Sequence, residues 1–370
     1  MAKSVLVCMS GGVDSTVAAL LLKRQGFDVA GLTFWFWSFP KAPSFRGTTK
    51  CCSIDSASLA ARELGIPHDV VDASDAFQRL VLDDFVARLR GGETPNPCGR
   101  CNRLVRFGLA AAYANEHGLD YIATGHHARL ACDENGRFSL LRGRDPCKDQ
   151  TYFLYGLGQE VLSRLLLPVG ELEKDEVFAI ARREQLTAAH LPESQDLCFA
   201  VGDDVSFLFD ERDYAPGPIL DREGHEVGRH RGLPRYTIGQ RRGLGIVSPR
   251  PLYVIALDPR RNAIIVGGEE DLLRDTLIAT DAVYACGGPP TDGVNLQAKI
   301  RYRSPASRAR FAATGEATFR LTFETPQRAV TPGQLAVLYD GERLLGGGII
   351  SQSSTSPAPR DVYSPPRRGG

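Results

Sequence analysis

A chain of 370 residues is long enough for two or three domains with cores of their own. Its 44 Lys and Arg residues balance its 44 Asp and Glu residues, which excludes attraction of nucleic acid over the whole surface. The sequence contains nine cysteines but no secretory signal segment and no apolar run of about 18 residues, so we expect a reducing, cytoplasmic location and no membrane partner.

The chain opens with a predicted strand, a tight loop and a helix. Residues 5–9 are apolar and predict a buried parallel strand, and residues 16–25 predict a helix. The loop between them reads Ser10, Gly11, Gly12, Val13, Asp14 and Ser15. Its glycines allow the backbone N–H groups to face inward, and its serines add hydroxyl donors at a helix N-terminus, a combination that favours a bound phosphate.

This loop has neither the lysine-containing P-loop pattern nor the three-glycine dinucleotide pattern. It resembles the Ser-Gly-Gly-x-Asp-Ser loop of the ATP-pyrophosphatase (PP-loop) superfamily. In that superfamily, ATP is cleaved between its α and β phosphates so that AMP can be transferred to a carbonyl oxygen. An ordinary Gly-Gly turn between a strand and a helix is the alternative.

Strands and helices alternate through the rest of the first half. We expect strands at residues 29–33, 69–71 and 121–124, and helices at residues 55–64, 75–89 and 103–117. This alternation predicts an α/β fold with a doubly wound parallel sheet, which binds ligands at the carboxyl ends of its strands. Phe34 follows the second strand, where an aromatic ring can face adenine, and Gly125 and His126 follow the strand at 121–124.

Near residue 213 the helical periodicity gives way to short β-like runs separated by Gly and Pro. These runs lie at residues 252–256, 263–266, 296–302, 317–321 and 335–339. The sequence therefore predicts a catalytic domain over residues 1–212, a small β-rich central domain over 213–274, a C-terminal β-barrel over 275–352 and a disordered tail over 353–370.

Two stretches of the second half are rich in arginine. Residues 222–250 hold seven arginines and two glutamates, and residues 301–310 hold four arginines and no acidic residue. Arginine forks suit phosphates, and tyrosine rings in the same region can stack on unpaired bases. The two stretches favour RNA as a partner, with a solvated basic face as the alternative.

Three cysteines are candidates for chemistry. Cys98 and Cys101 lie three residues apart in a loop restricted by Pro and Gly, before a helix whose dipole lowers a thiol pKa. Cys198 lies 97 residues beyond Cys101. Because the sequence has no second pair with zinc-ligand spacing, a structural zinc site is the weaker interpretation.

Eight motifs occur in the order found in the tRNA-specific 2-thiouridylase family. They lie at residues 10–15, 51–53, 94–101, 123–126, 148–153, 194–199, 237–241 and 300–303. The resemblance spans about residues 4–350. It implies a sulfurtransferase that uses ATP to adenylate the C2 oxygen of the wobble uridine of tRNA, replaces that oxygen by sulfur, and releases AMP and pyrophosphate. The sulfur would arrive as a persulfide from a relay protein fed by a cysteine desulfurase.

The resemblance also implies roles for individual residues. Cys198 would accept the persulfide, and Cys101 would release its sulfur and form a disulfide with Cys198. The residues implied to bind ATP, together with Mg²⁺, are Cys8, Met9, Ser10, Gly11, Gly12, Val13, Asp14, Ser15, Phe34 and Gly125. The residues implied to contact tRNA are Asn96, Pro97, Cys98, His126, Lys148, Asp149, Gln150, Arg301, Tyr302 and Gln334.

Some members of the family have an aspartate where this chain has Cys98. Three thiolates at Cys98, Cys101 and Cys198 would suit a [4Fe-4S] cluster with one open iron, which is the alternative to the persulfide route. Other functions left open are a 4-thiouridine or 2-thiocytidine synthetase, a small-molecule amidotransferase, and a non-catalytic tRNA-binding protein whose cysteines hold a structural metal.

Overall fold

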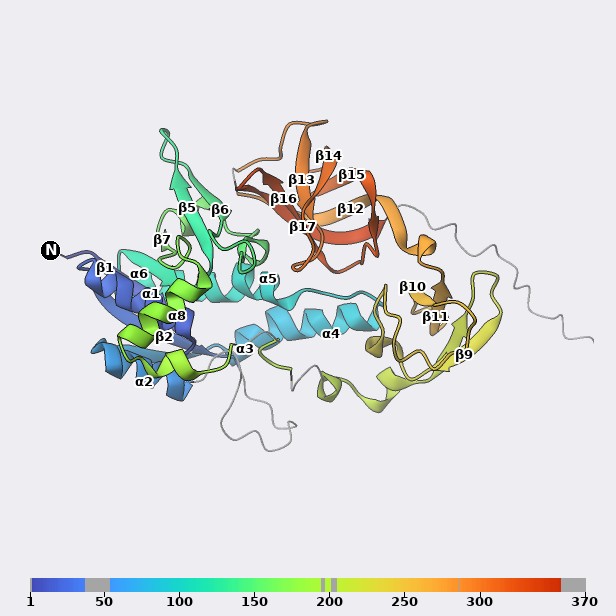
Figure 1. The fold of residues 1–370 in the computed structure, drawn as a ribbon, viewed down its shortest axis with the longest axis horizontal. Helices are drawn as coiled ribbons and strands as arrows, with labels where there is room; N and C mark the ends of the chain where they lie inside the picture. The colour runs from blue at the N-terminus through green and yellow to red at the C-terminus, as the bar shows by residue number, and fades with distance from the viewer. Residues whose placement is uncertain (1, 37–53, 194–196, 201–204, 286, 354–370) are drawn as a thin grey trace, which may run out of the picture.

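The computed structural model describes residues 2–36, 54–193, 197–200, 205–285 and 287–353. It contains an α/β part, a small β-rich part around β8 to β11, and a β-barrel, with helices α4 and α5 extending from the α/β part beneath the barrel (Figure 1). Cys51, Cys52 and the predicted tail beyond residue 353 lie outside the described residues. Within those residues, no helix is long and apolar enough to cross a membrane.

The α/β part is built on a five-stranded parallel sheet of order β3-β2-β1-β4-β7. The strands are β1 (Ser4–Cys8), β2 (Asp28–Trp35), β3 (His68–Asp72), β4 (Tyr121–Thr124) and β7 (Leu165–Leu166). Successive residues of β1 point to opposite faces, so Val5 and Val7 enter one hydrophobic cluster and Leu6 and Cys8 another. The predicted doubly wound parallel sheet is confirmed.

Helices cover both faces of this sheet. The first cluster holds residues of α1 (Val13–Arg24), α2 (Ile54–Leu64) and α8 (Lys174–Arg183). The second holds residues of two long helical segments, each interrupted by one π-helical stretch. These segments comprise α3 (Ser74–Phe77), η1 (Gln78–Leu82) and α4 (Asp83–Arg90), and then α5 (Pro97–Cys101), η2 (Asn102–Arg106) and α6 (Phe107–Glu116).

The prediction that Cys98 and Cys101 precede a helix beginning at residue 103 is wrong. Helix α5 begins at Pro97, so both cysteines are helical. The Asn96 side chain caps this helix by accepting a hydrogen bond from the Gly99 N–H at 3.1 Å, and proline is favoured at the first helical position. These local signals outweigh the cost of the glycine inside the helix.

A β-hairpin in the first half was not predicted. It consists of β5 (Ala128–Cys132) and β6 (Phe138–Arg142), and the Asp133 carboxylate fixes its turn by accepting N–H bonds from Asn135 and Arg137. Strand β6 pairs with β17 of the barrel, so the hairpin extends the barrel sheet (Figure 1). Helix α8 and strand β7 were also missed.

The central part is a four-stranded sheet of order β10-β11-β8-β9. Its strands are β8 (Gly217–Leu220), β9 (Glu226–His230), β10 (Tyr253–Asp258) and β11 (Ala263–Gly267). Buried Ile219, Tyr236, Val254 and Ile264 belong to its small core. Among the described residues, the remaining short helices are η3 (Thr151–Phe153), α7 (Gln159–Leu162), η4 (Thr187–His190), η5 (Ser206–Leu208), η6 (Glu211–Tyr214), η7 (Leu233–Arg235) and η8 (Glu270–Leu272).

The predicted C-terminal barrel is confirmed. Its strands are β12 (Leu273–Tyr284), β13 (Asn295–Lys299), β14 (Ser307–Gly315), β15 (Thr318–Arg328), β16 (Leu335–Asp340) and β17 (Arg343–Ser353). Strand β12 pairs with both β15 and β17, which closes the sheet. Alternate residues such as Phe311, Phe319 and Leu321 face inward and are fully buried.

Candidate functional site

The Ser-Gly-Gly loop lies at the carboxyl end of β1 and leads into α1. Ser15 Oγ accepts the Ser10 N–H at 3.2 Å and donates to the Gly12 carbonyl at 3.1 Å, so the loop is held by its own side chains. Gly11 has a φ of 80°, a left-handed conformation that favours glycine. The loop is therefore ordered at the N-terminus of a 12-residue helix, where an anion is stabilised.

Gly125, at the carboxyl end of the neighbouring strand β4, touches this loop. A Cβ at Gly125 would lie 2.5 Å from the Ser15 nitrogen and 2.6 Å from the Asp14 carbonyl carbon. Any side chain at this position would push the loop out of place. The structure thus places Gly125 against Asp14 and Ser15, about 110 positions earlier in the chain. A single ligand could contact both segments only if they lie this close together.

The Asp14 carboxylate has two partners from distant parts of the chain. Lys174 Nζ lies 2.7 Å from both Asp14 carboxylate oxygens, and His127 Nε2 lies 3.0 Å from one of them. Burial would raise the pKa of Asp14, but the His127 hydrogen bond and the Lys174 ammonium outweigh it and hold this pKa below its usual value. Asp14 is accordingly a carboxylate at neutral pH.

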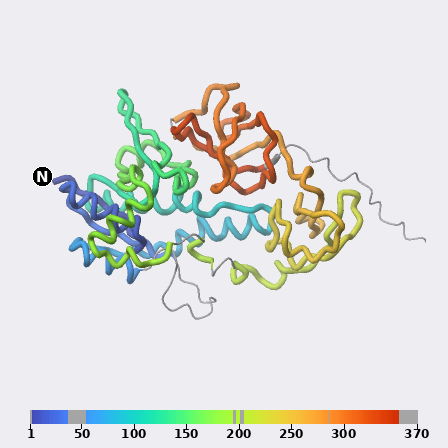
Figure 2. Tube along the Cα trace, in the orientation of Figure 1, coloured from blue at the N-terminus to red at the C-terminus, as the bar shows by residue number. Residues whose placement is uncertain are grey.

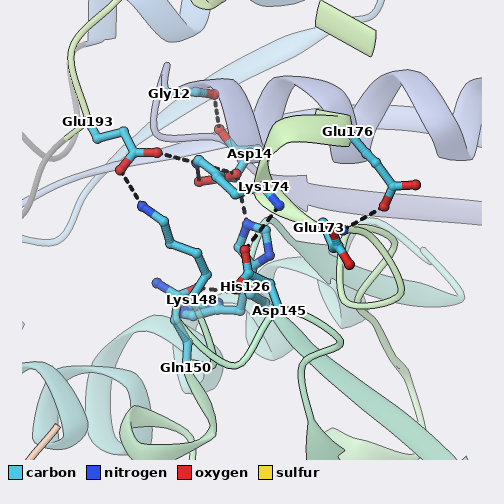
Figure 3. Close-up of polar contacts among 12 residues, drawn as sticks. Gly12, Asp14, His126, Asp145, Lys148, Gln150, Glu173, Lys174, Glu176 and Glu193 are labelled. Atoms are coloured by element: carbon cyan, nitrogen blue, oxygen red, sulfur yellow. Dashed lines mark hydrogen bonds and ion pairs between the residues drawn. The ribbon is translucent and has the colours of Figure 1, made fainter. Parts of the chain in front are cut away.

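Lys174 continues the network to a second acidic residue and a second lysine. Its ammonium lies 3.0 Å from Glu193, and Glu193 accepts a 2.7 Å hydrogen bond from Lys148 (Figure 3). Burial would raise the pKa of Glu193, but the hydrogen bonds and positive charges of Lys148 and Lys174 outweigh burial and hold this pKa below its usual value. The Glu193 carboxyl is therefore also charged. The loop contains no lysine of its own, and this network supplies one ammonium in contact with it, Lys174, and a second, Lys148, linked through Glu193.

Lys174 is placed by the first turn of α8. A capping box between Glu173 and Glu176 fixes the helix start, and the Lys174 backbone N–H donates to Asp145 at 3.2 Å. Its side chain is only 9% exposed and points to Asp14 rather than to solvent (Figure 3). Sequence reasoning missed Lys174 and His127 because no motif spacing connects either residue with the loop.

The other residues implied to bind ATP are largely buried. Burial raises the pKa of Cys8 to about 11, so its thiol is neutral and packs as a small apolar side chain. Met9 is 3% exposed. Phe34 is 3% exposed and stacks on Phe36 with ring centroids 5.9 Å apart. The Phe34 ring is therefore almost fully covered by protein in this structure.

His126 follows Gly125 and is neutral. Its Nδ1 lies 2.8 Å from the Thr124 hydroxyl, and its ring lies 6.0 Å from that of Phe107. Burial, assisted by the positive charge of Arg106, lowers the pKa of His126 to about 3. His126 therefore offers a neutral imidazole, and no positive charge, to any RNA it meets.

The turn at residues 148–150 divides its side chains between the interior and the charged network. Asp149 is 3% exposed and accepts hydrogen bonds from the Gly143 N–H and from Thr151. Gln150 accepts the His127 N–H at 2.9 Å and so supports the histidine that contacts Asp14. Of the three residues, Lys148 alone reaches the charged network.

Cys101 and Cys198 enter the same hydrophobic cluster. Cys101 is 7% exposed and Cys198 is partly buried against the cluster. The segment that carries Cys198 is fixed by Phe199, whose ring packs 5.2 Å from Phe85 and 6.1 Å from Phe77. The fold therefore brings these two cysteines into one region, whereas Cys98, one helical turn before Cys101 on α5, is not a member of this cluster.

The barrel residues implied to contact tRNA adjoin the α/β part. The Tyr302 and Phe153 rings lie 4.5 Å apart, and Arg301 donates to the carbonyls of Arg328 and Ala329. Gln334 donates a 2.7 Å hydrogen bond to the Thr94 carbonyl. Tyr302 and Gln334 thus join the barrel to the segments at 148–153 and 94–101, whereas the bonds of Arg301 stay within the barrel.

In the described part of the chain, no group of three or more His, Cys, Asp and Glu side chains could hold a metal ion. Cys98, Cys101 and Cys198 thus do not form a three-thiolate ligand set. The donor set that an iron–sulfur cluster needs does not fit this structure.

The fold and this site define an α/β protein with a phosphate-binding type of loop at the carboxyl edge of its parallel sheet, joined to two β-rich parts. Residues 3–202 match the family model described as a tRNA methyl transferase HUP domain. Residues 205–268 match a tRNA methyl transferase PRC-barrel domain, and residues 274–350 match an aminomethyltransferase beta-barrel domain.

Curated relatives cover nearly the full length of the chain. The tRNA-specific 2-thiouridylase MnmA of Moorella thermoacetica is 47% identical over 352 residues, covering 93% of this chain and 98% of that protein. The protein of the same name from Geobacter metallireducens is 45% identical over 361 residues, covering 95% and 98%. The chain therefore belongs to the tRNA-specific 2-thiouridylase family, which confirms the resemblance seen in its motifs.

A solved 4-thiouridine synthetase–RNA complex with bound ATP aligns with 50% of this chain and 41% of that chain. Its TM-score of 0.32 and sequence identity of 15% are too low to support any conclusion about this chain.

Proposed function

We propose that this protein is an ATP-dependent sulfurtransferase that converts the wobble uridine of tRNA to 2-thiouridine. One observation carries the proposal: the chain matches a 2-thiouridylase over 93% of its own length and 98% of the Moorella protein, rather than over the nucleotide domain alone. A 4-thiouridine or 2-thiocytidine synthetase would share the loop, but it would not explain the match through both β-rich parts.

ATP supplies the activation step. The Ser-Gly-Gly loop binds the phosphates, and the C2 oxygen of uridine attacks the α phosphorus, which forms an adenylated base and releases pyrophosphate. The loop N–H groups and the ammonium of Lys174 stabilise the departing charge. Mg²⁺ prefers one or two carboxylates together with phosphate oxygens, so Asp14 would serve as its ligand once the ATP phosphates compete for the Lys174 ammonium that now contacts both Asp14 oxygens. The ion would neutralise part of the pyrophosphate charge.

Sulfur then replaces the activated oxygen. A sulfur-relay protein transfers the outer sulfur of its persulfide to the Cys198 thiol, so that Cys198 then carries a persulfide. The Cys101 thiolate attacks the Cys198 sulfur, forms the Cys101–Cys198 disulfide and expels hydrosulfide. Hydrosulfide adds to C2, and AMP leaves with the former carbonyl oxygen. Because the cycle ends with the Cys101–Cys198 disulfide, an external dithiol must reduce it before the next cycle. The shared cluster of the two cysteines supports this assignment.

Recognition of tRNA involves both β-rich parts and the mouth of the nucleotide site. Residues 222–250 and 301–310 offer arginines to backbone phosphates. A wobble base lies in a single-stranded loop and can turn outward at low cost. Asn96, Cys98, His126, Lys148 and Gln150 lie on the segments that would surround the turned-out base.

The test is a reconstituted reaction of the protein with a tRNA transcript, ATP and a protein persulfide, followed by mass spectrometry of the nucleosides. We expect 2-thiouridine at the wobble position together with AMP and pyrophosphate. Thiolation of another base, or ADP and orthophosphate as products, would overturn the proposal.

A further inference from the structure

The segment at residues 91–96 lies where the three parts of the chain meet. It joins α4 to the cysteine-containing helix α5. In Figure 2, its cyan chain reaches the yellow and orange region of β8 to β11 while passing beneath the barrel. The contacts that hold this segment therefore decide where α5 begins.

A barrel loop between β15 and β16 forms hydrogen bonds with the backbone of Thr94 and packs against it. The Thr94 N–H donates to the Pro332 carbonyl at 2.8 Å, and the Thr94 carbonyl accepts the Gln334 side-chain N–H at 2.7 Å. Gly333, between these two, packs directly on the segment, since a Cβ there would lie 2.9 Å from the Thr94 carbonyl carbon and 3.0 Å from the Pro95 nitrogen. Both backbone polar groups of Thr94 thus bond to the barrel.

This barrel loop is itself held rigidly. Gly333 donates its N–H to the Ile350 carbonyl at 2.8 Å, and the Ile350 N–H donates to the Gln334 carbonyl at 2.8 Å. The buried Thr331 hydroxyl donates to the Ala329 carbonyl at 2.8 Å. Because Gly333 and Gln334 both bond to the backbone of Ile350 on β17, the loop is a fixed support for the segment that it contacts.

The central part holds the other side of the segment. Gly92 packs so closely that a Cβ there would lie 2.9 Å from Pro259 Cγ. Arg90, at the end of α4, forms two parallel hydrogen bonds of 2.7 and 2.8 Å with the Asp213 carboxylate. The segment is therefore fixed at its start by the central part and at Thr94 by the barrel.

The hydrogen bonds that fix Thr94 lie only a few residues before the cysteines of α5. Asn96, two residues later, caps α5. The barrel touches this helix a second time, because a Cβ at Gly99 would lie 2.7 Å from Leu335 Cδ1. The barrel loop thus contacts the chain on both sides of Asn96, Pro97 and Cys98.

We propose that the barrel loop 331–335 positions helix α5 for the sulfur-transfer step, with Gln334 acting through the backbone of Thr94. The inference rests on the proposed function and adds to it: the barrel contributes to the chemical step as well as to tRNA docking. Gln334 is then a positioning residue, whereas the family resemblance implies that it contacts tRNA. A positioning role predicts that loss of Gln334 lowers the single-turnover rate, whereas a tRNA contact predicts that it weakens tRNA binding.

The experiment compares Gln334→Met, which removes the N–H donor at similar length, with Gln334→Lys, which retains one. Gly333→Ala tests the close packing independently. Gln327→Met is the matched control, because Gln327 lies on the same barrel and bonds there to Ser307 and to the Thr325 carbonyl. For each protein, tRNA affinity, the single-turnover rate at saturating tRNA and ATP, and hydrogen exchange of residues 94–101 are measured.

Gln334→Met should lower the single-turnover rate about tenfold, the factor expected for loss of one hydrogen bond that supports α5. Gly333→Ala should also lower this rate, because its Cβ would displace Thr94 and Pro95. The tRNA affinity should change less than about twofold, and amide exchange at residues 94–101 should accelerate. Gln334→Lys should recover most of the rate, and Gln327→Met should match the parent.

Weaker tRNA binding by Gln334→Met, with an unchanged single-turnover rate and unchanged exchange, would assign Gln334 to direct tRNA contact and overturn the inference. The exchange measurement needs no activity. It therefore separates failure of this inference from failure of the proposed function, in which the parent protein itself would form no 2-thiouridine.

Discussion

Lys174 Nζ lies 2.7 Å from both carboxylate oxygens of Asp14, although 160 residues separate the two in sequence. The acidic residue of the loop therefore has its counter-ion on α8. Because the nearby Glu193 also contacts Lys174, the ammonium is shared between two carboxylates before any nucleotide binds. The phosphates of ATP would compete with both for the same positive charge.

Removing this charge should weaken nucleotide binding. Charge-assisted hydrogen bonds contribute about 1.5–3 kcal/mol, so Lys174→Met should raise the Kd for ATP at least about tenfold. Lys174→Arg should retain part of the affinity. Calorimetric titration with ATP provides the measurement, and Lys3→Met, at the opposite end of the strands, is the control. Equal affinity of Lys174→Met and the parent would remove Lys174 from the phosphate site.

The three candidate cysteines should respond differently to replacement by serine. Cys101→Ser and Cys198→Ser should each abolish thiolation, because each thiol changes oxidation state in the proposed cycle. Cys98→Ser should retain measurable activity, and Cys98→Asp should also remain active. Nucleoside mass spectrometry gives the activity, and peptide mapping after one turnover should reveal a Cys101–Cys198 disulfide.

Cys132 is exposed and serves as the control for this series, so Cys132→Ser should behave as the parent does. A protein that carries about four irons and loses all activity as Cys98→Ser would instead indicate a cluster. That outcome would contradict both the persulfide route and the arrangement of the three cysteines.

Arg241 and Arg242 are exposed and should bind backbone phosphates. Each lost phosphate contact reduces the slope of log K against log salt by roughly one for a duplex and less for a single strand. Arg241→Ala and Arg242→Ala should therefore weaken tRNA binding at low salt and leave the Kd for ATP unchanged. Identical salt dependence in both variants and the parent, measured by filter binding, would place the docking surface elsewhere.

Arg301 is a poorer probe of tRNA contact, because its guanidinium donates to the Arg328 and Ala329 carbonyls within the barrel. Arg301→Ala should lower barrel stability as well as tRNA affinity. A thermal melt distinguishes the two effects.

His126 should make the protein less stable in acid. Its pKa of about 3 lies below the value near 6.5 of an unfolded histidine, so between these pH values the unfolded chain binds a proton that the folded chain does not. The contribution of His126 is complete above pH 6.5 and is lost as the pH falls towards 3, at up to about 1.4 kcal/mol per pH unit. His126→Gln should remove this component.

Urea unfolding of the parent and His126→Gln at pH 7.0, 6.0 and 5.0 tests this sign, with the mutation effect compared across pH values. The parent should lose more stability than the variant over this range. Equal losses would mean that His126 protonates in the folded protein near its ordinary pKa.

The sequence predicts the parallel sheet, the phosphate loop and the barrel because each depends on local signals: alternating strands and helices, two glycines after a buried strand, and short runs separated by turns. The contacts of Asp14 with Lys174 and His127 depend on how α8 and the residues after β4 pack against the loop. The hairpin β5–β6 has a local turn signal at Asp133, but its attachment to the barrel depends on pairing with β17 about 200 residues later. Tertiary packing decides these contacts, and no local pattern reports it.

The pairing of β6 with β17 has a consequence for the order in which the protein can mature on the ribosome. The nucleotide-binding half leaves the ribosome early, but the edge of its hairpin finds a neighbour only when residue 343 and the strand after it have emerged. Until then β6 presents an open edge, and Tyr152 lacks an acceptor for its hydroxyl until Leu335 of β16 has emerged. Synthesis of β17 thus completes the sheet that the β5–β6 hairpin joins, and a chain halted before β17 would leave the edge of β6 open to pairing with other chains.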